Sequence, residues 1–319
     1  MVKVGSVGQS ATSRSKTHRA TYVQSSVGRV RAWRSKWLAA VSGAAFSAWL
    51  FPGLGFAGAR PLQVTELLVR QYEDGPPAPR DYEFLPNDIV HLSFRIANFT
   101  IGKEDRVRLS YRIEALDPEG RPLAEPETGR VDTEITFKDK EAGWRPIVRY
   151  QVMVPPAAPS GDYTLVVQVE DEFSKATARG QANFRVRGRP VSRSESLVIQ
   201  NFNFYAEETA MEPLGRPVYA PGTSVWSRFD ITGYKLGPNN RFSIEYGIRV
   251  IREDGKVLFE QPVAAQEERE SFYPEWHTMG LFSLNLAPDI SRGAYRVVVT
   301  VRDRIGNQTY EGEYTFRVE

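Results

Sequence analysis

The sequence predicts an all-β protein of two tandem antiparallel β-sandwiches, preceded by a cleaved N-terminal segment. Three observations lead to this prediction. Apolar and polar side chains alternate over many short stretches, which is typical of strands buried on one face. The pattern occurs twice, because residues 62–123 match residues 197–258 at a constant shift of 135 positions. No 12-residue stretch after residue 59 has a helical period.

The composition excludes several classes of site. The chain has 319 residues, enough for about two domains. It contains no cysteine, so thiolate zinc sites, iron–sulfur clusters, thiol nucleophiles and a lipoprotein anchor are excluded. Only three histidines are present, which leaves little material for histidine-based catalysis.

The charges divide the chain at residue 59. Residues 1–59 hold eight of the 41 basic residues and no acidic residue, so residues 60–319 have 33 basic and 39 acidic side chains and a formal charge of −6. A polyanionic partner needs a surplus of basic side chains. This balance therefore argues against a nucleic-acid partner for residues 60–319.

Residues 1–59 have the layout of an export signal. A basic region precedes the apolar stretch 38–51, Pro52 interrupts it, and small residues at Ala57 and Ala59 provide a signal-peptidase site. We expect cleavage between Ala59 and Arg60 and a secreted or periplasmic protein. The alternatives are that residues 37–59 stay as a membrane anchor, that residues 1–28 are an organellar transit peptide, or that translation starts further downstream.

The repeat gives the domain limits. A second match at a shift of 132 positions, after a three-residue length difference, runs to the end of the chain and pairs Trp144 with Trp276. We expect a signal peptide at 1–59, a sandwich at 60–187, a polar linker at 188–196 and a second sandwich at 197–319. Units of this size are large enough to fold as domains.

Period-two alternation identifies the strands. In residues 90–96 the even positions are apolar and the odd ones are polar, and residues 107–115 repeat this with the odd positions apolar. The second copy places apolar residues at 242, 244, 246, 248 and 250. Turn residues at 117–120 and 253–255 follow these strands, and further strands are expected near 150–154, 163–169 and 184–186.

Two segments resemble a known kind of module. Residues 160–167 (SGDYTLVV) and 292–299 (RGAYRVVV) each lead to an aspartate, and the second copy continues with DRIGN at 303–307. They resemble the late strands of tandem immunoglobulin-like or fibronectin-III-like modules of bacterial envelope or secreted proteins. The first copy has EFSK at 172–175 in that turn. The resemblance implies an Ig-like sandwich and specifies activity poorly, because such modules serve many functions.

Residues recurring in both copies have structural and functional interpretations. Tyr163 and Tyr295 fit buried corner tyrosines whose hydroxyls bond the backbone, with ligand contact as the alternative. Asp171 and Asp303 recur at strand ends, where an interdomain calcium site is conceivable. One carboxylate per site does not supply the six to eight oxygens that calcium needs.

Four residues are candidates for contact with a partner or a sugar. Trp226 and Arg228 share the outward phase of their strand, where a tryptophan either binds a partner or packs between domains. Tyr273 and Trp276 belong to a second aromatic cluster at residues 272–276. For Trp276 a plug over the end of the sandwich is the alternative to sugar stacking.

The sequence predicts a non-enzymatic exported protein that binds another envelope component through rigid tandem Ig-like domains. It has no nucleophile elbow, P-loop, zinc motif or EF-hand loop, so we expect no catalytic residue, no metal and no cofactor. The partner is a protein or polysaccharide of the cell envelope, with membrane contact only through an uncleaved signal segment. The alternative functions are a carbohydrate-binding protein that uses exposed aromatic side chains, and an enzyme with an unrecognised site.

Overall fold

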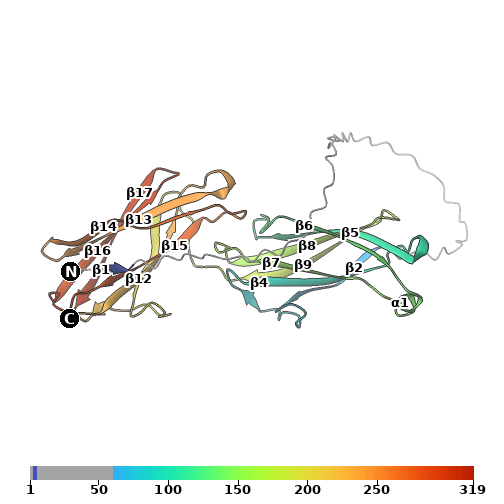
Figure 1. Ribbon diagram of the computed structural model, residues 1–319, viewed down its shortest axis with the longest axis horizontal. Coiled ribbons are helices and arrows are strands. Elements are labelled where there is room, and N and C mark those ends of the chain that lie inside the picture. Colours follow the sequence, from blue (N-terminus) through green and yellow to red (C-terminus); the bar gives the residue numbers. More distant parts are fainter. Residues whose placement is uncertain (1–2, 6–59) are drawn as a thin grey trace, which may run out of the picture. The chain divides into compact units, whose positions relative to one another are not determined.

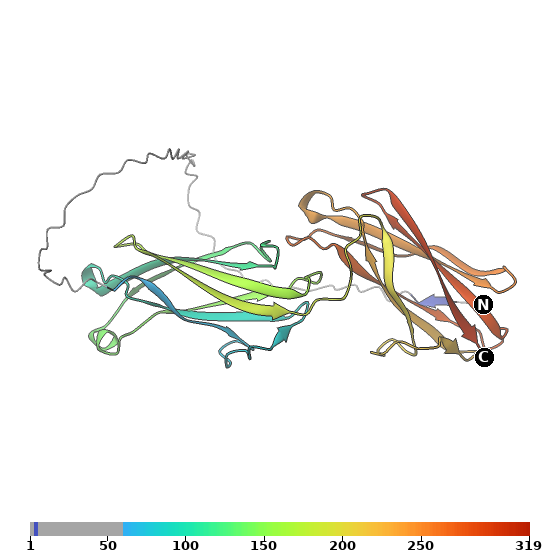
Figure 2. The ribbon, with the colours of Figure 1, turned by 180° about the vertical axis from the view of Figure 1, so that it is seen from behind.

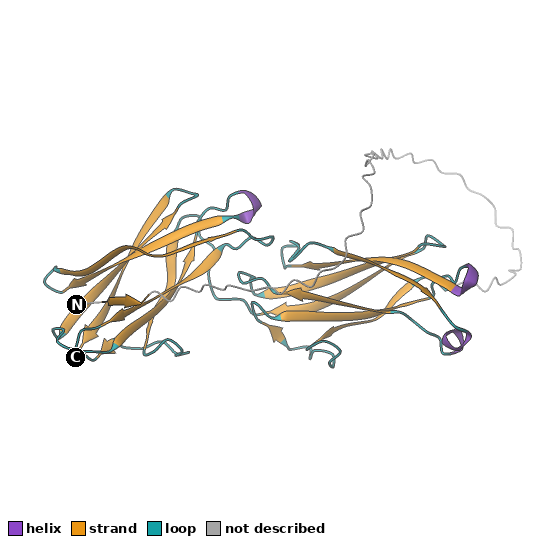
Figure 3. Cartoon of the chain, viewed as in Figure 1, coloured by secondary structure: helices purple, strands orange, loops and turns teal. Residues whose placement is uncertain are grey.

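The structure, a computed structural model, describes residues 3–5 and 60–319. Ala57, Ala59 and the apolar segment before them lie outside the described residues. Strands and loops make up almost all of the described chain (Figure 3), which confirms the all-β prediction. In this part of the chain, no helix combines the length and the apolar character needed to cross a membrane.

Residues 63–186 form a first sandwich of two sheets (Figure 1). Its strands are β2 (Gln63–Arg70), β3 (Glu83–Phe84), β4 (Ile89–Ala97), β5 (Arg106–Leu116), β6 (Glu127–Glu134), β7 (Ile147–Met153), β8 (Gly161–Asp171) and β9 (Thr177–Val186). One sheet has the order β2-β4-β7 and the other the order β3-β9-β8-β5-β6. All neighbours are antiparallel except β3 and β9, which are parallel.

Residues 198–318 form a second sandwich with the same strand order, and the reverse view in Figure 2 shows its two layers from behind. Its strands are β10 (Val198–Tyr205), β11 (Val218–Tyr219), β12 (Ser224–Thr232), β13 (Phe242–Arg252), β14 (Val257–Arg269), β15 (His277–Asn285), β16 (Gly293–Asp303) and β17 (Gln308–Val318). The sheets are β10-β12-β15 and β11-β17-β16-β13-β14. A short strand β1 (Lys3–Gly5) is added antiparallel to β15.

The two sandwiches repeat each other in backbone detail. Glu66 in β2 and Asn201 in β10 both have φ near +50°, and each lies at a β-bulge where the pairing register shifts. These two residues are 135 positions apart, which is the shift found in the sequence. The internal repeat is therefore a repeat of structure, including its irregularities.

Each sandwich has its own hydrophobic core, as the alternation predicts. The apolar residues of β4 and β5 that the pattern points inward, such as Phe94 and Leu109, are at most 2% exposed, except Tyr111, which is partly buried. Phe229 and Ile244 are their buried counterparts in the second core. Burial of apolar surface is the main favourable contribution to folding, so the two cores account for the two sandwiches.

β13 departs from the one-sided burial that the sequence predicts. Ser243 and Glu245 lie at its outward positions, yet they are only 5% and 2% exposed. Arg302 and Arg304 reach over the sheet and pair with the Glu245 carboxylate, 3.5 and 2.5 Å away. Long arginine side chains cover this face with their aliphatic parts, which period-two alternation does not reveal.

The topology is that of an Ig-like sandwich with a three-stranded and a five-stranded sheet. The strand β6, which follows β5, pairs with β5 and so belongs to the larger sheet. The chain between β6 and β7 forms the short helix α1 (Phe137–Glu141), with a capping box at Thr136. Within residues 60–319 no strand pairs with the outer edge of β7.

Two turns of 3-10 helix recur at the same place in the two copies. They span Lys103–Asp105 and Pro238–Asn240 and lead into β5 and β13. Both contain residues with positive φ, again 135 positions apart.

Candidate functional site

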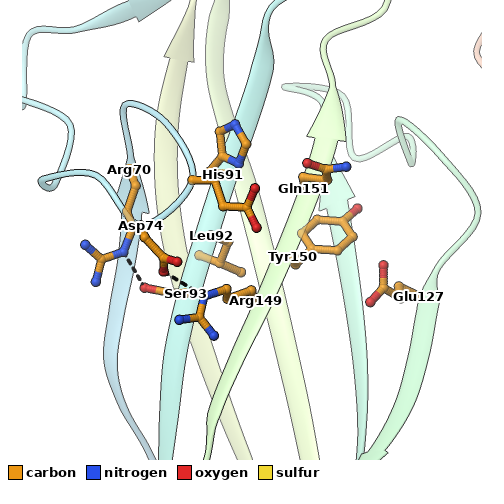
Figure 4. A pocket seen from close by; sticks show the side chains of 10 residues that line it. Arg70, Asp74, His91, Leu92, Ser93, Glu127, Arg149, Tyr150 and Gln151 are labelled. Carbon is orange, nitrogen blue, oxygen red and sulfur yellow. Dashed lines mark hydrogen bonds and ion pairs between the residues drawn. The ribbon is translucent and has the colours of Figure 1, made fainter.

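A polar cavity of about 250 Å³ lies on the first sandwich, on the sheet formed by β2, β4 and β7 (Figure 4). Arg70 comes from β2, His91 and Ser93 from β4, and Arg149 and Gln151 from β7. Neighbouring strands of a sheet place alternate side chains on one face. The cavity therefore gathers these polar groups from residues that are far apart in the sequence.

Internal bonds hold the two arginines of the cavity in place. The Nε of Arg70 donates to the Ser93 hydroxyl at 2.6 Å, and its guanidinium also donates to the carbonyl oxygen of Gly75. The Nε of Arg149 donates to the Asp74 carboxylate at 2.7 Å. These bonds tie the loop after β2 to the sheet, so the cavity wall is formed before any ligand binds.

Arg70 and Arg149 differ in how much charge they leave for a ligand. Arg149 is neutralised by Asp74, whereas the bonds of Arg70 go to a hydroxyl and a carbonyl, which carry no net charge. No carboxylate within residues 60–319 forms an ion pair with Arg70. The Arg70 guanidinium favours a ligand group that accepts hydrogen bonds, while the carboxylates of Glu73 and Asp74 on the same lining oppose a purely anionic ligand.

On the opposite side of the cavity, Glu127 of β6 faces Tyr150 of β7 (Figure 4). Burial, reinforced by the negative charge of Glu127, raises the pKa of Tyr150 to about 12. The tyrosine stays a neutral hydrogen-bonding group at physiological pH. The lining thus carries both charges, with cationic groups at Arg70 and Arg149 and carboxylates at Glu73, Asp74 and Glu127.

The same place on the second sandwich is aromatic. Tyr205 of β10 pairs with Trp226 of β12, as Arg70 of β2 pairs with His91 of β4. Tyr205 lies 135 positions after Arg70, and Trp226 lies 135 positions after His91. The guanidinium of Arg228 lies 4.2 Å from the centre of the Tyr205 ring. It also donates to the carbonyl oxygens of Glu208 and Ala210.

The structure brings together two of the four sequence-predicted contact residues. Trp226 and Arg228 lie on one face of β12 and are both partly exposed. Arg228 holds the loop after β10 in place and covers one face of the Tyr205 ring, which leaves Trp226 as the main flat surface of this patch. A contact role for Trp226 and Arg228 stays a prediction. The strand pattern indicated Trp226 as a contact residue, but no pattern indicated the cavity at His91, its counterpart in the first sandwich.

Tyr273 is placed away from this patch. It is only 3% exposed, packs with the core residues of the first sandwich, and donates its hydroxyl proton to the Asp117 carboxylate at 2.8 Å. Asp117 also accepts hydrogen bonds from the backbone N–H groups of Glu119 and Arg121. Because its ring is buried and its hydroxyl is bonded to Asp117, Tyr273 is not available for contact with a partner or a sugar.

Trp276 lies beside Tyr273 in sequence and is partly buried. The guanidinium of Arg193 lies 5.0 Å from its ring centre, and the ring of His277 lies 4.5 Å from it. Its indole N–H has no hydrogen-bond partner among the described residues. One face of Trp276 is therefore taken by a cation–π contact, which reduces the surface left for a sugar ring.

A buried polar cluster lies behind Trp276. Asp230 is 1% exposed although its strand phase is outward, because Arg189 and Asn201 cover and bond it at 2.8 and 2.9 Å. His277 is 5% exposed, and its Nδ1 has no partner among the described residues. Burial lowers the pKa of His277 to about 4, with Asp230 opposing and Arg189 reinforcing the shift.

The recurring tyrosines and aspartates are structural. The Tyr163 hydroxyl donates to the Pro159 carbonyl at 2.7 Å, and Tyr295 donates to the Ser291 carbonyl, which confirms the corner-tyrosine interpretation. Asp171 accepts the backbone N–H of Phe173 within its own turn at 2.9 Å and that of Thr100, in the loop after β4, at 2.7 Å. Burial by itself raises the pKa of Asp171. The hydrogen bonds that the carboxylate accepts from Thr100 and from the turn lower the pKa by more, so it lies below its ordinary value.

Asp303 has the equivalent function in the second sandwich. It accepts the backbone N–H groups of Lys235, Ile305 and Gly306. Within residues 3–5 and 60–319, no three His, Asp or Glu side chains are grouped so that they could hold a metal ion. Asp171 and Asp303, the carboxylates considered for a calcium site, accept hydrogen bonds that close turns.

Comparisons with known proteins add only distant likeness. No protein-family model and no curated protein matches the sequence. Among solved structures, the chain is similar to the C-terminal domain of the Streptococcus agalactiae AgI/II polypeptide BspA, at 10% identity, 81% coverage of this chain, 100% of that chain and a TM-score of 0.29. It is also similar to the C-terminal domain of the Streptococcus pyogenes antigen I/II-family protein AspA, at 10% identity, 82% and 100% coverage and a TM-score of 0.29.

A third similar structure is the native conformation of Escherichia coli alpha-2-macroglobulin, at 9% identity, 81% coverage of this chain, 17% of that chain and a TM-score of 0.25. Likeness at these identities and TM-scores supports no conclusion about partner or activity. The strand order, the parallel pairing of β3 with β9 and of β11 with β17, and the corner tyrosines establish the architecture by themselves. The described chain consists of Ig-like β-sandwiches.

Proposed function

We propose that this protein is an exported, non-enzymatic binding protein whose first sandwich binds another protein of the cell envelope. The observation that carries the proposal is the cavity on β2, β4 and β7, whose polar groups are fixed by internal bonds and open to solvent. A rigid sheet with fixed polar groups loses little conformational entropy on binding. The signal-like layout of residues 1–59 supports export.

A binding role agrees better with the cavity than catalysis does. The lining contains no threonine or lysine, and its one serine, Ser93, accepts a bond from Arg70 and bonds neither His91 nor a carboxylate in the described chain. His91 and Glu127 lie on opposite sides of the cavity in Figure 4. This arrangement suits recognition of a ligand that carries both charges, such as a protein surface.

The proposal is tested by affinity capture from the envelope fraction, with the exported protein as bait. We expect His91→Ala and Glu127→Lys to reduce recovery of the captured protein at least fivefold. The control is Gln168→Ala, an exposed position on β8 in the other sheet, which should recover as much as the wild type. Equal recovery by all variants would remove the cavity from the binding surface.

The second candidate function is carbohydrate binding at the second sandwich. The Trp226 side chain is partly exposed on β12, opposite Tyr205, and aromatic faces are suited to stacking on sugar rings. A polysaccharide pull-down with wild type and Trp226→Ala tests it. Retention of the wild type with loss in the variant supports this function, and no retention of the wild type on any envelope polysaccharide eliminates it.

A further inference from the structure

The outer edge of β7 has a row of free backbone groups. Pro146 and Val154 lie on either side of β7, and both bond towards β4. The Ile96 N–H donates to the carbonyl oxygen of Pro146, and the Val154 N–H donates to the carbonyl oxygen of Asp88. Hydrogen bonding alternates along an antiparallel strand. The N–H and C=O groups of Ile147, Arg149, Gln151 and Met153 therefore point away from β4, towards the open edge of the sheet.

The second sandwich shows that this position accepts a strand. β15 corresponds to β7, and β1 is added to its outer edge with Lys3 opposite Asn285 and Gly5 opposite Ser283. Further along β15, the Tyr246 hydroxyl donates to the carbonyl oxygen of Leu281 at 2.5 Å and accepts from its N–H at 3.2 Å. The edge of β15 is thus filled by one short strand and one tyrosine.

The edge of β7 lacks that tyrosine cap. Tyr111 corresponds to Tyr246, but its hydroxyl lies over Gly129 of β6, so close that a Cβ there would come within 2.2 Å of it. Gly129 thus gives Tyr111 room to point towards β6. Among residues 60–319, no strand pairs with the outer edge of β7, and no side chain bonds the outward backbone groups of its four residues.

The side chains of β7 leave this edge accessible. Charged side chains commonly protect an edge strand, but the Arg149 guanidinium is drawn over the sheet to Asp74 (Figure 4). Ile147 and Met153 are 37% and 56% exposed at the two ends of the strand. Exposed apolar groups on an unprotected edge are characteristic of a surface that another chain covers.

We propose that β7 is a strand-acceptor edge, to which an extended segment of the envelope protein partner adds antiparallel as the fourth strand of the sheet. This names the binding mode for the proposed function and rests on it. The incoming strand gains backbone hydrogen bonds to Arg149 and Gln151, as in β-strand addition. Its inward side chains meet Glu127 and Tyr150, so a lysine or arginine in that phase complements the Glu127 carboxylate.

The first test uses the full-length protein and a synthetic octapeptide with the sequence of residues 1–8, MVKVGSVG. In the uncleaved chain, which keeps residues 1–59, β15 already carries β1, so the equivalent edge that stays open is that of β7. We expect the peptide, at millimolar concentration, to slow amide exchange at Arg149, Gln151 and Met153 at least fivefold. No protection there, or protection confined to Ser283 and Asn285, contradicts the assignment.

Two N-methylated peptides test whether the backbone carries the binding. One is methylated at residues 3 and 5 and the other at residues 4 and 6, so that opposite edges of the strand are blocked. Antiparallel addition predicts that one of them binds as the unmodified peptide does and the other binds at least tenfold more weakly. Equal binding, or equal loss, shows that the peptide does not add as a strand.

A protein variant provides the matched test. Gln151→Pro removes the outward N–H group at an edge position where proline is tolerated, and we expect at least fivefold weaker peptide binding. Gln151→Ala removes the same side chain but keeps that N–H group, so we expect Gln151→Pro to bind the peptide at least fivefold more weakly than Gln151→Ala. If both variants weaken binding equally, the side chain is the contact and strand addition is wrong. Envelope capture that depends on His91 but not on Gln151→Pro would keep the proposed function and reject the strand mode.

Discussion

At the scale of single residues, the two corner tyrosines perform the same task in each sandwich. Tyr163 and Tyr295 are at most 1% exposed, and each bonds a backbone carbonyl four residues earlier in the chain. Removing the hydroxyl leaves that carbonyl without its partner. The bond and the buried ring together fix the approach to β8 and β16.

We expect Tyr163→Phe and Tyr295→Phe each to lower the free energy of unfolding by about 1 kcal/mol. Urea denaturation followed by circular dichroism measures this. Tyr82→Phe is the control, because Tyr82 is 38% exposed and should give no change beyond error. Equal midpoints for all three variants would show that the corner bonds contribute nothing.

His277 makes the stability depend on pH. Its pKa is about 4 in the folded protein against an ordinary value of 6.5, so the unfolded chain binds a proton more readily between these values. Stability from this group is fully present above pH 6.5, falls as the pH drops towards 4, and changes no further below that. The loss amounts to about 3 kcal/mol at most.

The measurement is the urea midpoint as a function of pH for the wild type, His277→Gln and His91→Gln. We expect the wild type and His91→Gln to lose stability in parallel between pH 6.5 and 4. His277→Gln should lose less over the same interval, whatever its stability at neutral pH. Three parallel curves would show that His277 is not the buried neutral histidine described above.

At the scale of elements, β13 is the strand whose outward face is closed by charged groups. Glu245 is 2% exposed and pairs with Arg302 and Arg304, whose side chains are 38% and 58% exposed. Water screens the two arginines, so losing the carboxylate costs less than losing one partner of a fully buried pair. We expect Glu245→Ala to destabilise the protein by about 1–2 kcal/mol.

Chemical denaturation also checks this prediction, with Glu260→Ala as the matched control. Glu260 is an exposed glutamate of the neighbouring strand β14 and forms no ion pair among the described residues. The control should behave as the wild type. A neutral or stabilising Glu245→Ala would mean that the carboxylate is easily replaced on this face.

The strands could be predicted because their information is local. Alternation at residues 90–96 needs only neighbouring residues, and the corner tyrosines follow from a short motif. The cavity could not be predicted, because it depends on which strands become neighbours. Arg70 and Arg149 are 79 positions apart in sequence and meet only through β4.

The contacts of Tyr273 and Asp230 escaped prediction for the same reason. Tyr273 bonds Asp117 across 156 positions, and Asp230 is buried by Arg189, 41 positions earlier. The alternation along the strand predicts that Asp230 points outward, but it does not indicate which residues cover the side chain. The open edge of β7 depends on a strand that is not formed, which no local pattern reports.

At the scale of the whole molecule, the duplication predicts two cores of equal importance. Phe94 and Phe229 occupy equivalent positions, 135 residues apart, and each is 1% exposed. We expect Phe94→Ala and Phe229→Ala each to cost about 3–5 kcal/mol. Hydrogen exchange should show the loss of protection confined to β2–β9 in the first variant and to β10–β17 in the second.

The central claim is that each copy of the repeat contains all that it needs to fold as an Ig-like sandwich. It is tested most directly by producing residues 60–187 and 197–319 as separate proteins and comparing their amide NMR spectra with that of residues 60–319. We predict two dispersed spectra whose peaks overlay those of the longer chain, except near Asp117 and Tyr273. Collapsed, poorly dispersed spectra from both pieces would contradict the account, since neither half would then be a domain.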